Sequence, residues 1–151
     1  MTHPRPFVVG LGSPHGDDQA GWLVVEKLHA WGWEQADARN LSQPVDLLDW
    51  LPTDRRLLMC DAAEAIPGCS GNCRTWIWPE QSLPTLKPGG SHDLALAEIL
   101  EYARQLKLHD TSVELRTIDG ANWTPFSEPS EAVRAAAERL ATLIHEESCR
   151  A

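Results

Sequence analysis

Short apolar runs alternate with segments of helical periodicity along almost the whole chain. Five runs are typical of strands, with the letters FVVGLG, ADARNLS, RLLMCDA, RTWIWP and TSVELRTID. Helices are expected over about 18–31, 44–52, 91–108 and 129–147. The order β-α-β-α-β-β-α-β-α predicts an α/β fold of three layers, with a central five-stranded, mostly parallel or mixed sheet between helices. RTWIWP is expected near an edge of that sheet.

Length and charge restrict the class of protein. The 151 residues contain no repeat, low-complexity run or linker, so we expect a single domain over 1–151. The chain carries 13 Lys and Arg against 22 Asp and Glu, a net charge of −9, without a basic cluster that could follow a nucleic-acid backbone. Its apolar runs are too short for a membrane span or a secretory signal. We therefore expect a cytoplasmic protein, monomeric apart from transient complexes, with no nucleic-acid or membrane partner.

The loop GSPHGDD after the first strand combines a glycine-rich turn with two acids. Its glycines are arranged much as in a phosphate-binding turn, but Asp17 and Asp18 at the start of a helix would repel phosphate. One aspartate is enough to cap the helix. The second, for which we take Asp18, can face the cleft and bind a cation or take part in proton transfer.

Two further polar residues are expected at the same edge of the sheet. Asp61 follows the apolar run LLMC, and His92 stands in the first turn of a helix after Gly-Gly-Ser. The positive end of a helix favours neutral imidazole, which is the metal-binding form. Singly, Asp61 could bond loop N–H groups and His92 could be a capping or surface residue. Together with Asp18 they suit a borderline divalent cation such as nickel, zinc or ferrous iron, or an acid–base set without metal.

The cysteines offer a weaker alternative. Cys69 and Cys73 resemble half of a zinc site, but no second half exists, so loop packing is the favoured interpretation. Cys60 lies within an apolar strand and is expected to be a small core residue. Ser13 lacks the G-x-S-x-G frame of a serine hydrolase.

Four stretches of the chain resemble the hydrogenase maturation endopeptidases, the family that trims the C-terminal tail of the nickel-iron hydrogenase large subunit. They are VVGLGSPHGDDQAGW, LLMCDAAEA, GGSHDLALAEIL and the closing helix after EPSEAVRAAAERL. The resemblance implies an α/β fold, peptidase activity and a nickel-loaded large-subunit precursor as partner. It also implies that Asp18, Asp61 and His92 are both the catalytic and the metal-contacting residues, with nickel carried by the substrate and no permanent metal in the protein. Nickel can then polarise the scissile carbonyl or orient a water, and the acids can serve as base.

The first loop departs from the family pattern, which leaves other functions open. Many relatives have Asn-Pro and one more residue before the acids, whereas this chain has Ser13-Pro14-His15-Gly16. We interpret His15 as a solvent-exposed loop residue rather than an additional ligand. One alternative function is a non-catalytic metal- or protein-binding module of the same fold. Another is a peptidyl-tRNA hydrolase-like enzyme, suggested by GLGSP but opposed by the acidic charge and the missing Thr-Arg-His-Asn stretch.

Overall fold

The structure is a computed structural model that describes residues 5–51, 53–83, 91–109 and 112–149, without the side chains of 91–95. Its sheet has five strands in the order β2-β1-β3-β5-β4. Four strands are parallel, and β4 pairs antiparallel with β5 at the edge. The strands are β1 (Phe7–Leu11), β2 (Ala38–Leu41), β3 (Leu57–Glu64), β4 (Cys73–Trp78) and β5 (Val113–Gly120). The predicted mixed sheet, element order and edge strand are confirmed.

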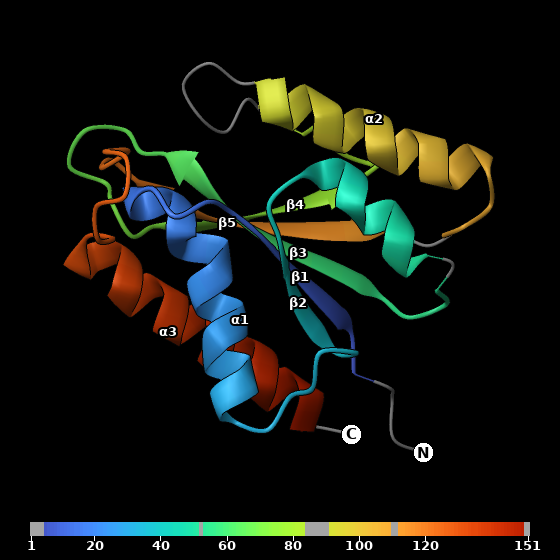
Figure 1. Cartoon of the computed structure of the whole chain (residues 1–151), viewed down its shortest axis with the longest axis horizontal. Coiled ribbons are helices and arrows are strands. Elements are labelled where there is room, and N and C mark those ends of the chain that lie inside the picture. Colours follow the sequence, from blue (N-terminus) through green and yellow to red (C-terminus); the bar gives the residue numbers. More distant parts are fainter. Residues whose placement is uncertain (1–4, 52, 84–90, 110–111, 150–151) are drawn as a thin grey trace.

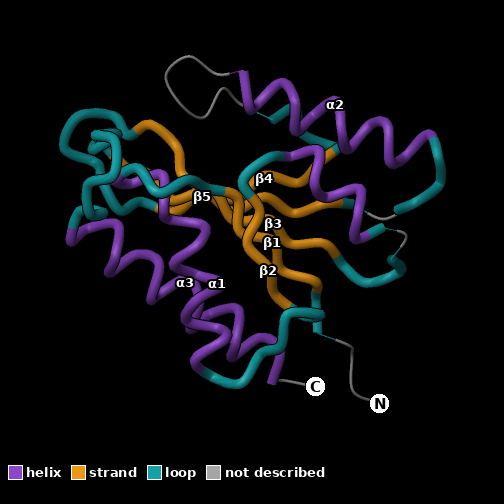
Figure 2. Tube along the Cα trace, viewed as in Figure 1, coloured by secondary structure: helices purple, strands orange, loops and turns teal. Residues whose placement is uncertain are grey.

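Helices cover both faces of the sheet, as Figures 1 and 2 show. On one face α1 (Ala20–Ala30) packs with α3 (Glu131–Cys149). On the other, α2 (Ser91–Gln105) packs with the short 3-10 helix η2 (Pro44–Trp50). None of the described helices is long and apolar enough to cross a membrane.

Strand β3 contributes alternate side chains to the two cores. Leu58, Cys60 and Ala62 pack with residues of α1 and α3. Leu57 and Met59 belong to the second core, which includes residues of α2 and η2. Because side chains alternate along a strand, Asp61 lies on the α2 face.

Helix α1 approaches the sheet closely at Gly21. A Cβ atom there would collide with the backbone oxygens of Cys60 and Leu11, so only glycine fits. This contact places the start of α1, and the loop before it, directly over the carboxyl ends of β1 and β3.

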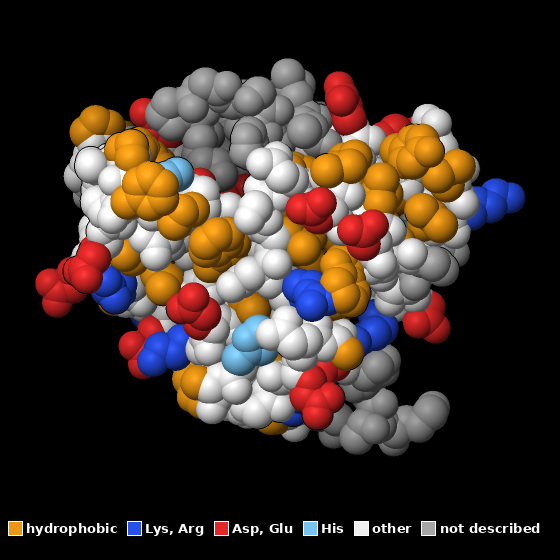
Figure 3. Space-filling model, in the orientation of Figure 1, with side chains coloured by type: hydrophobic (Ala, Val, Ile, Leu, Met, Phe, Trp, Pro, Cys, Tyr) orange, Lys and Arg blue, Asp and Glu red, His pale blue; other side chains and the backbone are white. Residues whose placement is uncertain are grey.

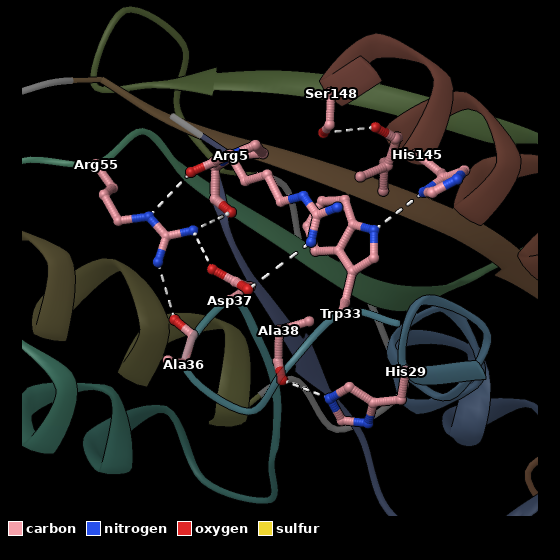
Figure 4. A network of polar contacts seen from close by, with 11 residues as sticks. Arg5, His29, Trp33, Ala36, Asp37, Ala38, Arg55, His145 and Ser148 are labelled. Carbon is pink, nitrogen blue, oxygen red and sulfur yellow. Dashed lines mark hydrogen bonds and ion pairs between the residues drawn. The ribbon is translucent and has the colours of Figure 1, made fainter. Parts of the chain in front are cut away.

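A polar network at the opposite end of the sheet has a structural role (Figure 4). The Arg55 guanidinium donates to the backbone oxygens of Arg5, Pro6 and Ala36 and pairs with Asp37 at 2.9 Å. It therefore ties the starts of β1, β2 and β3 together, and it involves no residue predicted for the functional site.

Two boundaries differ from the sequence-based expectation. β3 continues three residues past Asp61, because Ala62, Ala63 and Glu64 remain paired with β5. The helix expected from Asp18 begins instead with a 3-10 turn, η1 (Gly16–Gln19), and α1 follows at Ala20.

Candidate active site

Asp17 anchors the loop that follows β5. Its carboxylate accepts hydrogen bonds from the backbone N–H groups of Ala121 and Asn122, both at 2.9 Å, and of Ser130 at 2.7 Å. The side chain fits there because Gly120 has no Cβ, which would lie 2.6 Å from the Asp17 Cβ. Asp17 is 1% exposed, so its carboxylate serves the fold. One acid of the pair is structural as expected, but it holds a distant loop and makes no capping bond to η1.

The surroundings of Asp17 set its charge state. Burial by itself raises the pKa of this carboxyl group, whereas the hydrogen bonds from Asn122, Ser130 and Ala121 lower it. The net result is a pKa below the usual value for aspartate. The group is therefore a carboxylate at neutral pH and stabilises the loop as an acceptor.

Asp18 points to a different set of partners. The Ser13 hydroxyl donates to Asp18 Oδ2 at 2.5 Å, a short charge-assisted bond. The Asp18 backbone also holds the turn, donating to the His15 oxygen at 3.0 Å and accepting from the Ser13 N–H at 3.3 Å. The Asp18 side chain is half-buried. Its carboxylate is thus fixed in direction by a side chain from the same loop.

Asp61 reaches the same edge of the sheet from the neighbouring strand. Gly10 pairs with Cys60, so Asp61 lies one residue further, level with Leu11 at the end of β1. Helix η1, which carries Asp18, packs against β3. Asp61 is 4% exposed, and its Oδ1 accepts from the Ala62 N–H at 2.8 Å. The elements that carry the two acids, η1 and β3, are therefore in contact at this edge of the sheet.

His92 belongs to the first turn of α2, since that helix begins at Ser91. Helix α2 lies over the sheet face that carries Asp61, with Leu96 and Leu100 in the same core as Met59. The imidazole and the Ser91 cap lie outside the described side chains. Within the described part of the chain, no three His, Cys, Asp or Glu side chains are placed to hold a metal ion. The three-residue set therefore remains a prediction.

His15 connects the first loop to the β5–α3 loop. Its Nδ1 accepts a hydrogen bond from the Phe126 N–H at 3.0 Å, and the two rings meet edge to face at 4.6 Å. The ring is half-buried, whereas the sequence predicted a solvent-exposed residue. The sequence pattern contained no signal for this pairing.

The cysteines show no metal site in the described chain. All four are free thiols, and Cys60 is buried as predicted. Burial raises the pKa of the Cys60 thiol to about 12, which makes it inert.

Fold and site together define a three-layer α/β protein with two acids at the carboxyl edge of its sheet. Several solved structures with this fold are named hydrogenase maturation endopeptidases or proteases, and the chain has their architecture over nearly its whole length. The resemblance drawn from the sequence is therefore confirmed.

Three of these structures illustrate the match. The maturation protease HycI from Thermococcus kodakarensis is 26% identical, with 94% of this chain and 90% of that chain covered and a TM-score of 0.67. HybD from the same organism is 16% identical, with 96% and 99% covered and a TM-score of 0.78. HybD from Escherichia coli is 20% identical, with 95% and 94% covered and a TM-score of 0.73. No family model and no curated protein matches the chain.

Proposed function

We propose that this protein is an endopeptidase that removes the C-terminal extension of a nickel-loaded [NiFe]-hydrogenase large-subunit precursor. The observation that carries the proposal is the end-to-end structural match to proteins named hydrogenase maturation proteases. The positions of Asp18 and Asp61 support it, because an acidic edge suits a cationic centre in the substrate.

The nickel is part of the substrate, and three residues of this chain would contact it. Two carboxylates and an imidazole, from Asp18, Asp61 and His92, form a donor set that suits a borderline divalent ion. Bound there, nickel supplies Lewis acidity to a nearby carbonyl or water. The protein's own part is to hold that centre against the scissile bond and to exclude substrates that lack it.

The acids also provide the proton transfers that hydrolysis needs. A carboxylate takes a proton from water while the water oxygen bonds to the carbonyl carbon. It then gives that proton to the leaving amine as the C–N bond breaks. The Ser13 hydroxyl fixes the direction of the Asp18 carboxylate, while Asp61 is held by its own strand.

Paired precursor preparations test the function. The purified protein is incubated with the nickel-loaded large-subunit precursor and with its nickel-free form, and loss of the tail is followed by mass spectrometry. Cleavage of the loaded form alone is expected. Binding without cleavage of either form would instead indicate a non-catalytic module of the same fold.

Cellular placement belongs to the same proposal. Maturation of a large subunit before its assembly would take place in the cytoplasm, through a transient complex of the precursor with one copy of this chain. On the face shown in Figure 3, basic side chains are scattered and form no continuous patch, which supports a protein partner over nucleic acid.

A further inference from the structure

A row of three polar residues crosses neighbouring strands on the α2 face of the sheet. Thr117 on β5 is the register partner of Asp61 on β3 and also of Arg74 on β4. Register partners place their side chains on the same face, and neighbouring strands lie about 4.8 Å apart. Arg74 therefore stands about 10 Å from Asp61 along the row.

The middle of this row is polar without a structural reason. Thr117 is 0% exposed, and its Oγ1 has no hydrogen-bond partner. A buried hydroxyl without a hydrogen-bond partner lowers stability, and valine would fill the same space without one. The row therefore runs from Asp61 through a buried position to Arg74, which is its exposed end.

Arg74 is held in place by a buried acid. Its Nε and Nη2 donate to Asp119 Oδ1 at 3.3 and 2.9 Å, and its guanidinium lies 5.7 Å from the centre of the Trp76 ring. The Asp119 side chain is 6% exposed, whereas that of Arg74 is 44% exposed. Among the described residues, Nη1 donates no hydrogen bond. Asp119 therefore fixes a partly exposed guanidinium that has one more N–H group to donate.

We propose, on the basis of the proposed function, that Arg74 binds a carboxylate in the C-terminal extension of the precursor. The metal-bearing body of the substrate would lie at the Asp18 and Asp61 end of the row. The extension is the segment free to lie stretched toward β4, and about 10 Å corresponds to about three extended residues. A guanidinium in a fixed orientation recognises a carboxylate by paired hydrogen bonds.

Arg104 offers a matched control for Arg74. It too pairs with a carboxylate, Glu101, at 2.8 Å and lies 5.9 Å from a tryptophan ring, that of Trp78. Trp78 pairs with Val113 at the start of β5, at the end of the sheet away from Asp61. Arg74→Met should raise KM for the nickel-loaded precursor about tenfold to hundredfold, with kcat within about twofold. Arg104→Met should change neither.

Two further experiments identify the carboxylate and control for misfolding. Precursors whose extension has Asp and Glu replaced by Asn and Gln, or has an amidated C-terminus, distinguish a side chain from the terminal group. The replacement that removes the recognised carboxylate should raise KM for the wild type and leave the KM of the Arg74→Met variant unchanged. Arg74→Lys keeps the positive charge but loses the paired N–H donors of the guanidinium, so it should show an intermediate KM. Thermal melts verify that each variant is folded.

The outcomes separate the two proposals. Wild-type cleavage with an unchanged KM in both Arg74 variants overturns this inference alone, as does a wild type that is insensitive to both precursor changes. A wild type that cleaves no precursor overturns the proposed function and this inference with it.

Discussion

The carboxylate of Asp17 and the backbone N–H of Ser130 are joined at 2.7 Å across 113 residues of sequence. Two more N–H groups of the same loop donate to this carboxylate. The first loop and the start of α3 are thus one structural unit, and the shape of the loop that carries Asp18 depends on it.

Asp17→Asn should lower the free energy of unfolding by about 2 kcal/mol, because an amide cannot accept three N–H bonds as a carboxylate does. Urea titration followed by circular dichroism measures the change. Asp18→Asn is the matched control and should cost less than about 1 kcal/mol. Equal stability of the wild type and Asp17→Asn would contradict the structural role of Asp17.

The stability difference between wild type and Asp17→Asn should depend on pH. The folded-state pKa of Asp17 lies below its unfolded value, so its contribution is complete above about pH 4 and is lost as the pH falls through the folded-state pKa. The two proteins should therefore converge in stability in acid. Urea midpoints between pH 7 and pH 3 measure this, and a constant difference would argue against the lowered pKa.

Asp18→Asn and His92→Ala should each remain folded and fail to process the nickel-loaded precursor, because each removes a group that we propose contacts the metal centre. Processing is followed by mass spectrometry and folding by thermal melts. If both variants process at the wild-type rate, the assignment of these residues is wrong.

Ser13→Ala should reduce kcat about tenfold while leaving the fold intact. The substitution removes the hydroxyl that directs the Asp18 carboxylate at 2.5 Å. Steady-state cleavage measures kcat, and Ser13→Thr, which keeps the hydroxyl, should recover most of it. A kcat that is unaffected by Ser13→Ala would show that Asp18 needs no such support.

Cys60 should resist alkylation in the folded protein. Its thiol is buried and has a pKa of about 12, whereas Cys73 and Cys149 are exposed. Iodoacetamide at pH 8 should modify the exposed thiols and reach Cys60 only after unfolding, as measured by peptide mass spectrometry. Rapid labelling of Cys60 in the native state would contradict the buried position.

The sequence was a good guide to the elements and a weak guide to their contacts. Apolar runs and helical periods indicated the element order, and Trp76 and Trp78 indicated a strand near the edge. The continuation of β3 past Asp61 was missed, because strand length depends on pairing with β5. The helix expected over 91–108 ends at Gln105, and Leu106 beyond it is 51% exposed.

The candidate site, too, was only partly predictable from the sequence. The presence of two adjacent acids in the first loop correctly indicated that one of them is structural, because a helix start needs only one acid. Its partners could not be found from local pattern, because Ala121 and Ser130 lie more than 100 residues away. The same separation concealed the His15–Phe126 contact. The row from Asp61 to Arg74 depends on strand register, which periodicity does not specify.

The long-range bonds of Asp17 also determine when the protein can act during its own synthesis. The partners of this carboxylate are translated more than 100 residues after Asp17 itself. A nascent chain whose residues 121–130 are still inside the ribosome therefore lacks the fixed first loop. We expect cleavage activity to appear only after this segment has emerged, so that the order of translation delays the protease.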